Sequence, residues 1–340
     1  MNVGILTFHM AHNCGAMLQA YALSKSIADL FSCECRIIDY RLPEIYSKYE
    51  AMLQMDPVEP KRLKFDWYMK TVLPLTATVS SLSEIKDFDL YIIGSDQIWN
   101  AEITQGYKDE YFGKCFPPGS YCISYAASTG TRIRDAKRFA ARLKRFRYVS
   151  VRESWLQKEL APYFPRGVAW CLDPVLLLER EQWGALPETP DRRRYILLYS
   201  FDMDEDEYLY LELWAGRHGL EIVELITHER VKRRGILYDG DYGPEEWINY
   251  VKNAAYVYTD SYHCALFAIL FDRKLRLLTH GRGRNERIDD ILNRLMLLPD
   301  EDGFYTVTKQ TAQHLAEGRK VSFHYLKKAV DLVEHEKAKF

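Results

Sequence analysis

The sequence predicts an α/β protein made of two domains, each with a mostly parallel sheet covered by helices. Short apolar segments alternate with helical patterns along nearly the whole chain, which is typical of parallel sheets. The 340 residues suffice for about two domains at roughly 150 residues each. A stretch rich in proline and arginine, 187–194, interrupts the alternation. We therefore expect one domain over 1–185, a second over 186–322, and a C-terminal helix over 323–340 that packs back on them.

In the first half, five short apolar runs bounded by polar residues are expected to be buried strands. They are 3–8, 36–40, 88–94, 121–126 and 148–151. Apolar residues recur at helical spacing in three segments, which are 16–30, 135–146 and 155–163. Residues 41–80 contain four prolines and are expected to form an inserted, partly helical region.

The second half repeats this pattern. Strands are expected at 195–201, 220–226, 255–259 and 275–278. Helices are expected at 205–218, from Pro244 onward, at 263–270 and at 288–297. Pro244 favours a helix start, because its fixed φ suits the first helical position. The acidic run 204–207 is interpreted as the first turn of a helix rather than a metal site, since carboxylates favour the positive end of the helix dipole.

The composition argues against several classes of protein. Lys and Arg number 46 and Asp and Glu 48, so the formal net charge is −2, whereas nucleic-acid binders are commonly basic. The sequence has no Gly-x-Gly-x-x-Gly, P-loop or Gly-x-Ser-x-Gly motif, so standard dinucleotide, nucleotide and hydrolase signatures are missing. Seven cysteines without a CxxC pair, and no apolar run of about 18 residues, predict a reduced cytoplasmic enzyme.

Polar side chains follow five of the expected strands. Ligands of open α/β sheets bind outside the carboxyl ends of the strands, so these positions are candidate site residues. They are 12–15, 95–100, Ser128, 152–153 and 259–263. A single Asp or Ser at a strand end is more often a helix N-cap than a catalytic residue, but five such strand ends together favour a ligand site.

The segment 259–263 gives the sharpest signal. A helix is expected to begin near Ser261, so its free N–H groups could bind an anion, and His263 in the first turn could donate a proton. Two interpretations stay open, because Ser261 could equally be a simple cap and His263 a packed core residue. Arg287 opens the next helix, where the dipole disfavours a cation, so it hints at an anionic partner. Arg284 could serve the same anion or lie in a solvated loop.

Together these motifs resemble the polysaccharide pyruvyl transferase family. The most specific strings are Gly-Ser-Asp-Gln-Ile-Trp-Asn at 94–100 and Thr-Asp-Ser-Tyr-His at 259–263. The other matching pieces are 4–8, 13–23, 37–40, 88–93, 124–128, 150–153, 172–176, and Arg287 ahead of 291–292. The resemblance implies a fold like glycosyltransferase-B, with two Rossmann-like domains facing across a cleft. It also implies transfer of a pyruvyl unit from phosphoenolpyruvate to a sugar of a surface or capsular polysaccharide intermediate, as a ketal.

The resemblance further implies roles for single residues. The catalytic residue would be His263, with Asp96 or Asp260 as partner base. The donor-binding residues would be Arg152, Ser261, Arg284 and Arg287. The acceptor-binding residues would be Asn13, Gln19, Ser95 and Asn100. The second domain would hold phosphoenolpyruvate as donor substrate, with no cofactor or metal expected. The first would face a glycan or lipid-linked saccharide, with peripheral association at the inner membrane face.

Two positions depart from the family pattern. Cys264 follows the histidine where the family usually has Gly, and Cys14 stands where Tyr is frequent. A side chain at 264 narrows the space for close backbone approach to a phosphate. Two other functions therefore stay open. The chain could be a nucleotide-sugar-dependent glycosyltransferase of the same fold, or a degenerate member that only binds a glycan.

Overall fold

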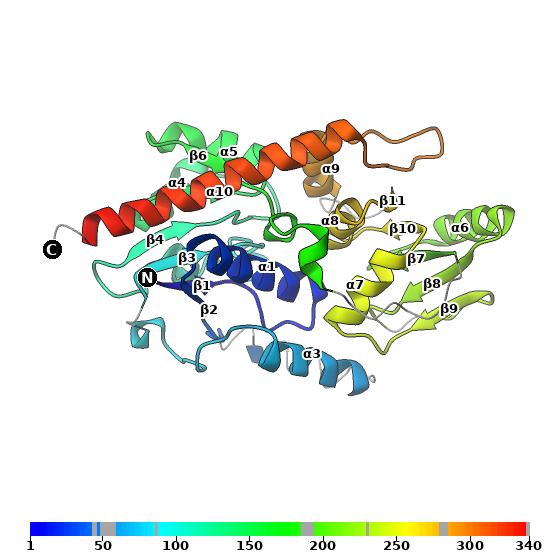
Figure 1. Cartoon of the computed structure of the whole chain (residues 1–340), viewed down its shortest axis with the longest axis horizontal. Coiled ribbons are helices and arrows are strands. Elements are labelled where there is room, and N and C mark those ends of the chain that lie inside the picture. Colours follow the sequence, from blue (N-terminus) through cyan, green and yellow to red (C-terminus); the bar gives the residue numbers. More distant parts are fainter. Residues whose placement is uncertain are drawn as a thin grey trace. The chain divides into compact units, whose positions relative to one another are not determined.

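The computed structural model describes residues 1–42, 46–47, 59–85, 88–184, 194–228, 231–278 and 285–337. The chain divides into two compact units (Figure 1). Unit 1 comprises Met1–Met55, Trp67–Leu177 and Ala316–Phe340. Unit 2 comprises Asp56–Asp66 and Leu178–Leu315. The chain therefore passes between the units more than once, because each unit collects segments that are far apart in the sequence.

Unit 1 is built on a four-stranded parallel sheet in the order β2-β1-β3-β4. Its strands are β1 (Asn2–Leu6), β2 (Glu34–Ile37), β3 (Leu90–Ile93) and β4 (Tyr121–Ser124). The short parallel pair β5 (Val149–Val151) and β6 (Val168–Trp170) continues from β4 through single bridges, of which Ala127 with Val151 is one. All four residues of β3 are buried, as expected for a strand of a parallel sheet that is covered on both faces.

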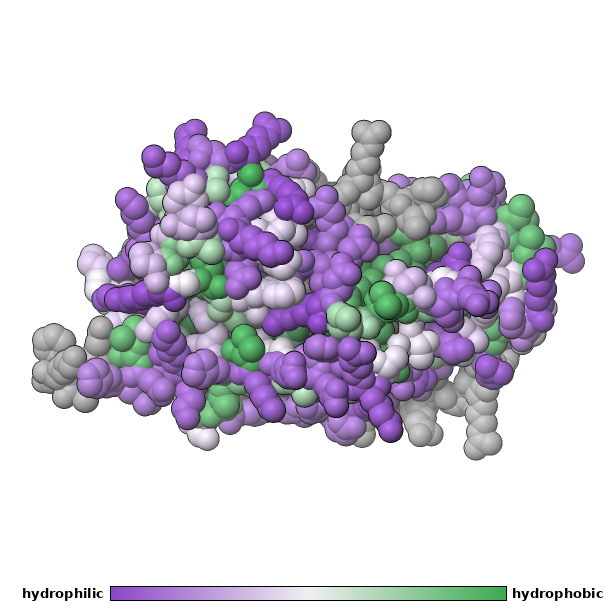
Figure 2. Space-filling view, turned by 90° about the horizontal axis from the view of Figure 1, so that it is seen from above, coloured by the Kyte–Doolittle hydropathy of each residue, from purple (hydrophilic) through white to green (hydrophobic). Residues whose placement is uncertain are grey.

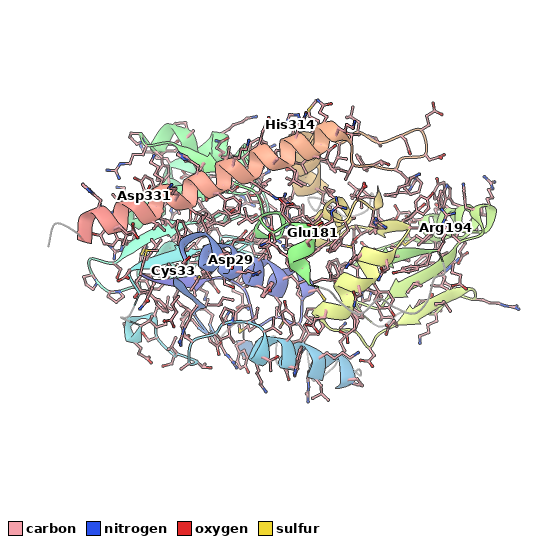
Figure 3. The ribbon with its side chains drawn as sticks, viewed as in Figure 1. Asp29, Cys33, Glu181, Arg194, His314 and Asp331 are labelled. Atoms are coloured by element: carbon pink, nitrogen blue, oxygen red, sulfur yellow. The ribbon has the colours of Figure 1, made fainter. Side chains whose placement is uncertain are left out.

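The helices of unit 1 are α1 (Cys14–Phe31), α4 (Ala136–Arg142), α5 (Ser154–Leu160) and the part of α10 (Lys309–Lys337) from Ala316 onward. Helix α3 (Glu59–Thr71) belongs to unit 2 up to Asp66 and to unit 1 from Trp67. Asn13 caps α1 by accepting a hydrogen bond from the Ala16 N–H, and Ser32 ends the helix in the left-handed conformation. In Figure 3, Asp29 is labelled near the end of α1, where it forms a surface ion pair of 3.0 Å with Lys25.

Helix α10 packs along unit 1 through its later turns. The Ser322 hydroxyl accepts a hydrogen bond of 2.9 Å from the Leu172 N–H, and the Tyr325 hydroxyl donates one of 2.6 Å to the Ser124 carbonyl. The helix begins at Lys309, which is earlier than the expected start at 323. Short 3₁₀ turns complete the described elements at Leu82–Glu84, Asp109–Phe112, Leu143–Arg145, Ala161–Tyr163, Pro174–Leu176 and Arg180–Trp183.

Unit 2 has a five-stranded parallel sheet in the order β11-β10-β7-β8-β9. Its strands are β7 (Tyr195–Tyr199), β8 (Glu221–Leu225), β9 (Ile236–Asp239), β10 (Tyr256–Thr259) and β11 (Lys274–Leu277). Its helices are α6 (Glu205–His218), α7 (Pro244–Asn253), α8 (Tyr262–Leu270) and α9 (Asn285–Arg294). Every residue of α8 is buried, so the helix that starts directly after β10 lies in the core of the unit.

The face of the molecule that Figure 2 shows is mostly hydrophilic, with apolar residues scattered among charged ones. Separate exposed apolar side chains of this kind are normal for globular proteins. Within the described residues, no helix is both long and apolar enough to cross a bilayer.

Candidate functional site

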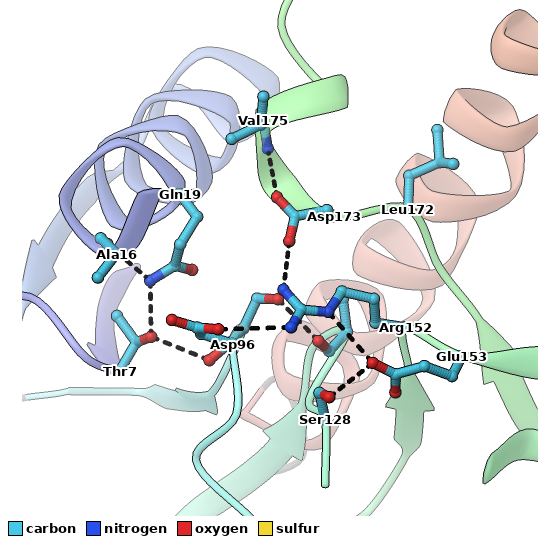
Figure 4. Close-up of polar contacts among 12 residues, drawn as sticks. Thr7, Ala16, Gln19, Asp96, Ser128, Arg152, Glu153, Leu172, Asp173 and Val175 are labelled. Atoms are coloured by element: carbon cyan, nitrogen blue, oxygen red, sulfur yellow. Dashed lines mark hydrogen bonds and ion pairs between the residues drawn. The ribbon is translucent and has the colours of Figure 1, made fainter. Parts of the chain in front are cut away.

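Arg152, which directly follows β5, is buried among three carboxylates (Figure 4). Its Nη1 is 2.6 Å from Asp173 Oδ2, its Nε 3.3 Å from Glu153 Oε1, and its Nη2 3.4 Å from Asp96 Oδ1. Glu153 also accepts a hydrogen bond of 2.6 Å from the Ser128 hydroxyl. A buried guanidinium is tolerated only when it is paired and hydrogen-bonded, so these carboxylates hold Arg152 in place. An anionic substrate could reach Arg152 only by replacing one of them, and Asp96 is the most distant.

The turn after β3 brings Asp96 to this cluster. Gly94 has a φ of +122°, and a Cβ at this position would collide with the Tyr125 carbonyl oxygen. Ser95 is buried, and its hydroxyl donates a 2.7 Å hydrogen bond to the Ala126 carbonyl. Asp96 itself adopts a φ of +69°, which is uncommon for a residue other than glycine. Ser95 is therefore committed to the turn, while the Asp96 carboxylate faces Arg152.

Gln19 is completely buried on α1 beside this turn (Figure 4). Its Nε2 donates to Thr7 Oγ1 at 2.9 Å, to the Phe8 carbonyl at 3.1 Å and to the Ala16 carbonyl at 3.0 Å. Its Oε1 is buried without a hydrogen-bond partner in the described part of the chain. A buried acceptor without a donor costs free energy. The hydrogen-bonding capacity of this amide oxygen is therefore unused within the described part of the chain.

The other two expected acceptor residues already serve the local backbone. Asn13 is exposed and caps α1. Asn100 donates from Nδ2 to Gln97 Oε1 at 2.9 Å and accepts at Oδ1 from the Glu102 N–H at 3.0 Å. Among the four residues expected to bind the acceptor sugar, Gln19 is the one with a buried oxygen, Oε1, that has no hydrogen-bond partner in the described part of the chain.

In unit 2, the Asp260 carboxylate holds the loop that follows β7. It accepts hydrogen bonds from the Phe201 N–H at 3.0 Å, from the Asp202 N–H at 3.0 Å and from the Ser200 hydroxyl at 3.2 Å. Several donors thus occupy its lone pairs. This arrangement favours a role for Asp260 in fixing the loop over a role as a base.

At the start of α8, the ring of Tyr262 contacts both His263 and Arg287. The Tyr262 and His263 ring centroids are 5.4 Å apart with near-perpendicular planes, and Arg287 Cζ lies 5.3 Å from the Tyr262 ring centroid. Ser261 caps the helix by accepting from the Cys264 N–H at 3.4 Å. A cation over an aromatic face is stabilised by the ring quadrupole. The Tyr262 ring therefore contacts both a histidine and an arginine at the N-terminus of α8, and a helix N-terminus suits an anion.

Cys264 lies in the core beside these residues. It is buried, and burial raises the pKa of its thiol to about 12, so the group stays a protonated thiol near neutral pH. Arg284, which the sequence placed in the donor site, lies outside the described residues.

Sequence reasoning named Glu153 and Tyr262 among the candidate positions but did not identify the residues that they contact. It missed Asp173 as a partner of Arg152, although Asp173 lies in the family-like string 172–176. It also missed His9, a buried histidine in the loop after β1 that is hydrogen-bonded to Asp39. Within the described ranges, no three His, Cys, Asp or Glu side chains form a group that could hold a metal ion.

The family model described as polysaccharide pyruvyl transferase matches residues 13–281. No curated protein matches the chain. Among solved structures, it is similar to UDP-GlcNAc 2-epimerase from Neisseria meningitidis bound to UDP-GlcNAc, with a TM-score of 0.51 and 10% identity over 98% of this chain and 94% of that one. A putative UDP-N-acetylglucosamine 2-epimerase from Listeria monocytogenes has a TM-score of 0.49 and 10% identity, over 97% of this chain and 89% of that one. The E. coli heptosyltransferase WaaC with ADP has a TM-score of 0.45 and 11% identity, over 84% of this chain and 89% of that one.

The likeness to the Neisseria enzyme concerns the fold, because the sequence identity is only 10%. With two parallel α/β sheets, it confirms the predicted α/β, glycosyltransferase-B-like fold class. The family match covers 13–281, which is well over half of the chain, and includes both specific strings. The chain belongs to the polysaccharide pyruvyl transferase family.

Proposed function

We propose that this chain transfers a pyruvyl unit from phosphoenolpyruvate to a sugar of a surface or capsular polysaccharide intermediate, forming a ketal. The observation that carries the proposal is that the Tyr262 ring, at the start of α8, contacts both the His263 ring and the Arg287 guanidinium. Phosphoenolpyruvate is anionic and reacts by protonation at carbon. It therefore needs a cation and a proton donor side by side.

The reaction proceeds in two additions. A proton adds to the methylene carbon of phosphoenolpyruvate, and a sugar hydroxyl bonds to the neighbouring carbon and loses its own proton. Phosphate then leaves with its bonding electron pair. A second hydroxyl of the same sugar bonds to that carbon and loses its proton, which closes the ketal. The products are the pyruvylated sugar and inorganic phosphate.

The roles follow from the chemistry of each group. His263 donates the proton to the methylene carbon, and Arg287 with the N-terminus of α8 binds the anionic groups of the donor. Ser261, which caps α8, contributes to the same end of the helix. On unit 1, the unpartnered Oε1 of Gln19 accepts a hydrogen bond from an acceptor hydroxyl.

Asp96 is the better candidate for the base. Its carboxylate makes a contact of 3.4 Å with Arg152, whereas Asp260 accepts hydrogen bonds from three groups of the loop after β7. Removal of Asp96 from Arg152 would free a carboxylate for proton acceptance.

The test is incubation of the purified full chain with phosphoenolpyruvate and a panel of lipid-linked or nitrophenyl glycosides. Mass spectrometry should show a product with the mass of a pyruvate ketal, together with phosphate release. Parallel reactions with nucleotide sugars test a glycosyltransferase of the same fold. Binding of a glycan without any product would indicate the degenerate, binding-only member.

A further inference from the structure

His9 lies in the loop between β1 and α1, and both of its ring nitrogens face acceptors. Only about 1% of the residue is exposed. Its Nδ1 is 3.1 Å from the Thr7 carbonyl oxygen, and its Nε2 is 3.0 Å from Asp39 Oδ1. A backbone carbonyl can only accept a hydrogen bond, and so can a carboxylate. The ring is therefore held between an acceptor of its own loop and the carboxylate of Asp39.

Asp39 is held as a carboxylate by several donors. Arg41 donates from Nε to Oδ1 at 3.0 Å and from Nη2 to Oδ2 at 3.0 Å, and the Thr78 hydroxyl donates to Oδ2 at 2.5 Å. Burial raises the pKa of Asp39, but the hydrogen bonds from His9, Arg41 and Thr78 outweigh it and hold that pKa well below its usual range. Asp39 therefore has no proton to give to the His9 ring.

His9 is connected through Thr7 to Gln19, the candidate acceptor-binding residue. The carbonyl that His9 binds belongs to Thr7, whose hydroxyl donates to the Ser95 carbonyl at 3.0 Å and accepts from Gln19 Nε2 at 2.9 Å. A shift of Thr7 would therefore move the amide of Gln19, whose Oε1 is the unpartnered acceptor atom.

We propose that His9 is a positioning residue that, held between the Thr7 carbonyl and Asp39, fixes the loop after β1 and sets Gln19 for the acceptor. The kinetic part of this inference rests on the proposed function, whereas the hydrogen bonding of the ring does not.

The first test is spectroscopic and needs no substrate. Long-range ¹H–¹⁵N spectra of the full chain show which histidine ring N–H protons are held in hydrogen bonds and exchange slowly with water. Loss of one ring signal in His9→Phe identifies His9, and His9→Gln serves if the first variant does not fold. A slowly exchanging ring N–H of His9 supports the proposal. A ring whose N–H exchanges as fast as that of an exposed histidine overturns it.

The second test separates positioning from catalysis. His9→Gln keeps one donor, and the KM for the acceptor should rise about tenfold while kcat and the KM for phosphoenolpyruvate change less than about twofold. His218→Gln, on α6 in unit 2, is the matched control and should change neither. An unchanged acceptor KM in His9→Gln, or a fall in kcat alone, overturns the positioning role.

A third measurement distinguishes failure of this inference from failure of the proposed function. Amide hydrogen exchange over 7–16 should be faster in His9→Gln than in the unaltered chain, since the clamp on the loop is lost. If the unaltered chain turns over no donor, the proposed function fails. Amide exchange and the ring spectra then still test whether His9 holds the loop. Equal amide exchange in both chains contradicts this role of His9.

Discussion

Arg287 lies over the ring of Tyr262, with its guanidinium carbon 5.3 Å from the ring centroid. Tyr262 is the residue directly before His263, and its ring meets the histidine ring edge to face at 5.4 Å. The Tyr262 ring thus contacts both the guanidinium of Arg287 on α9 and the imidazole of His263 on α8. This relationship within unit 2 underlies the donor site that we propose.

Replacement of Tyr262 should weaken donor binding. A cation–π contact contributes about 0.5–2 kcal/mol, so Tyr262→Leu should raise the KM for phosphoenolpyruvate by about 2- to 30-fold. Tyr262→Phe keeps the ring and should change that KM little. Steady-state kinetics with varied donor measures both variants. Equal effects of Leu and Phe would show that the aromatic face does not hold Arg287.

Removal of Arg152 should destabilise unit 1. Arg152→Met leaves three carboxylates together in a buried position, and breaking a buried ion pair costs about 3–5 kcal/mol. The midpoint of urea unfolding should fall accordingly. Lys25→Met breaks only the exposed pair with Asp29 and should cost less than about 1 kcal/mol. A midpoint for Arg152→Met equal to that of the control would contradict the structural role of the cluster.

Gly94 should tolerate no side chain. Gly94→Ala brings a Cβ against the Tyr125 carbonyl oxygen in a backbone conformation with positive φ, so a loss of about 1–3 kcal/mol or more is expected. Gly216 on α6 is the control, since a Cβ there meets nothing within 4 Å. Gly216→Ala should stabilise by about 0.5–1 kcal/mol, because alanine suits a helix interior. Thermal unfolding of both variants measures the contrast.

Cys264 should stay unreactive near neutral pH. Burial raises the pKa of its thiol to about 12, so its alkylation should not accelerate between about pH 7 and 9, where an ordinary thiol ionises. The native state holds this proton more tightly than the unfolded chain does. Its contribution to stability is therefore present below about pH 9 and lost as the pH rises toward 12. Peptide mass mapping after alkylation checks this, and rapid labelling of Cys264 in the folded chain would refute it.

Much of the fold was predictable from the sequence, because periodicity and turn residues are local signals. Helix α6 was expected at 205–218 and is found at Glu205–His218. The strand β9 (Ile236–Asp239) was missed, because four residues with one charged end show no clear alternation. The earlier start of α10 was missed because polar residues and Gly318 weaken the helical pattern of its first turns.

The site was predictable in part. The rule that polar residues collect at strand ends indicated Asp96, Arg152 and His263. The partners of each were not predictable, since Asp173 reaches Arg152 across 21 positions and Asp260 binds a loop 58 to 60 positions away. These pairings depend on which strands become neighbours, and the sequence pattern alone does not specify that order.

The central claim is tested most directly by single-turnover reaction of the unaltered chain and His263→Ala with phosphoenolpyruvate and a competent glycoside, read by mass spectrometry and phosphate release. We expect one pyruvate ketal and one phosphate per turnover from the unaltered chain, and a loss of at least about a hundredfold in His263→Ala. The His218→Ala control should react normally. Full turnover by His263→Ala, or a product whose formation requires a nucleotide sugar and not phosphoenolpyruvate, would contradict the account.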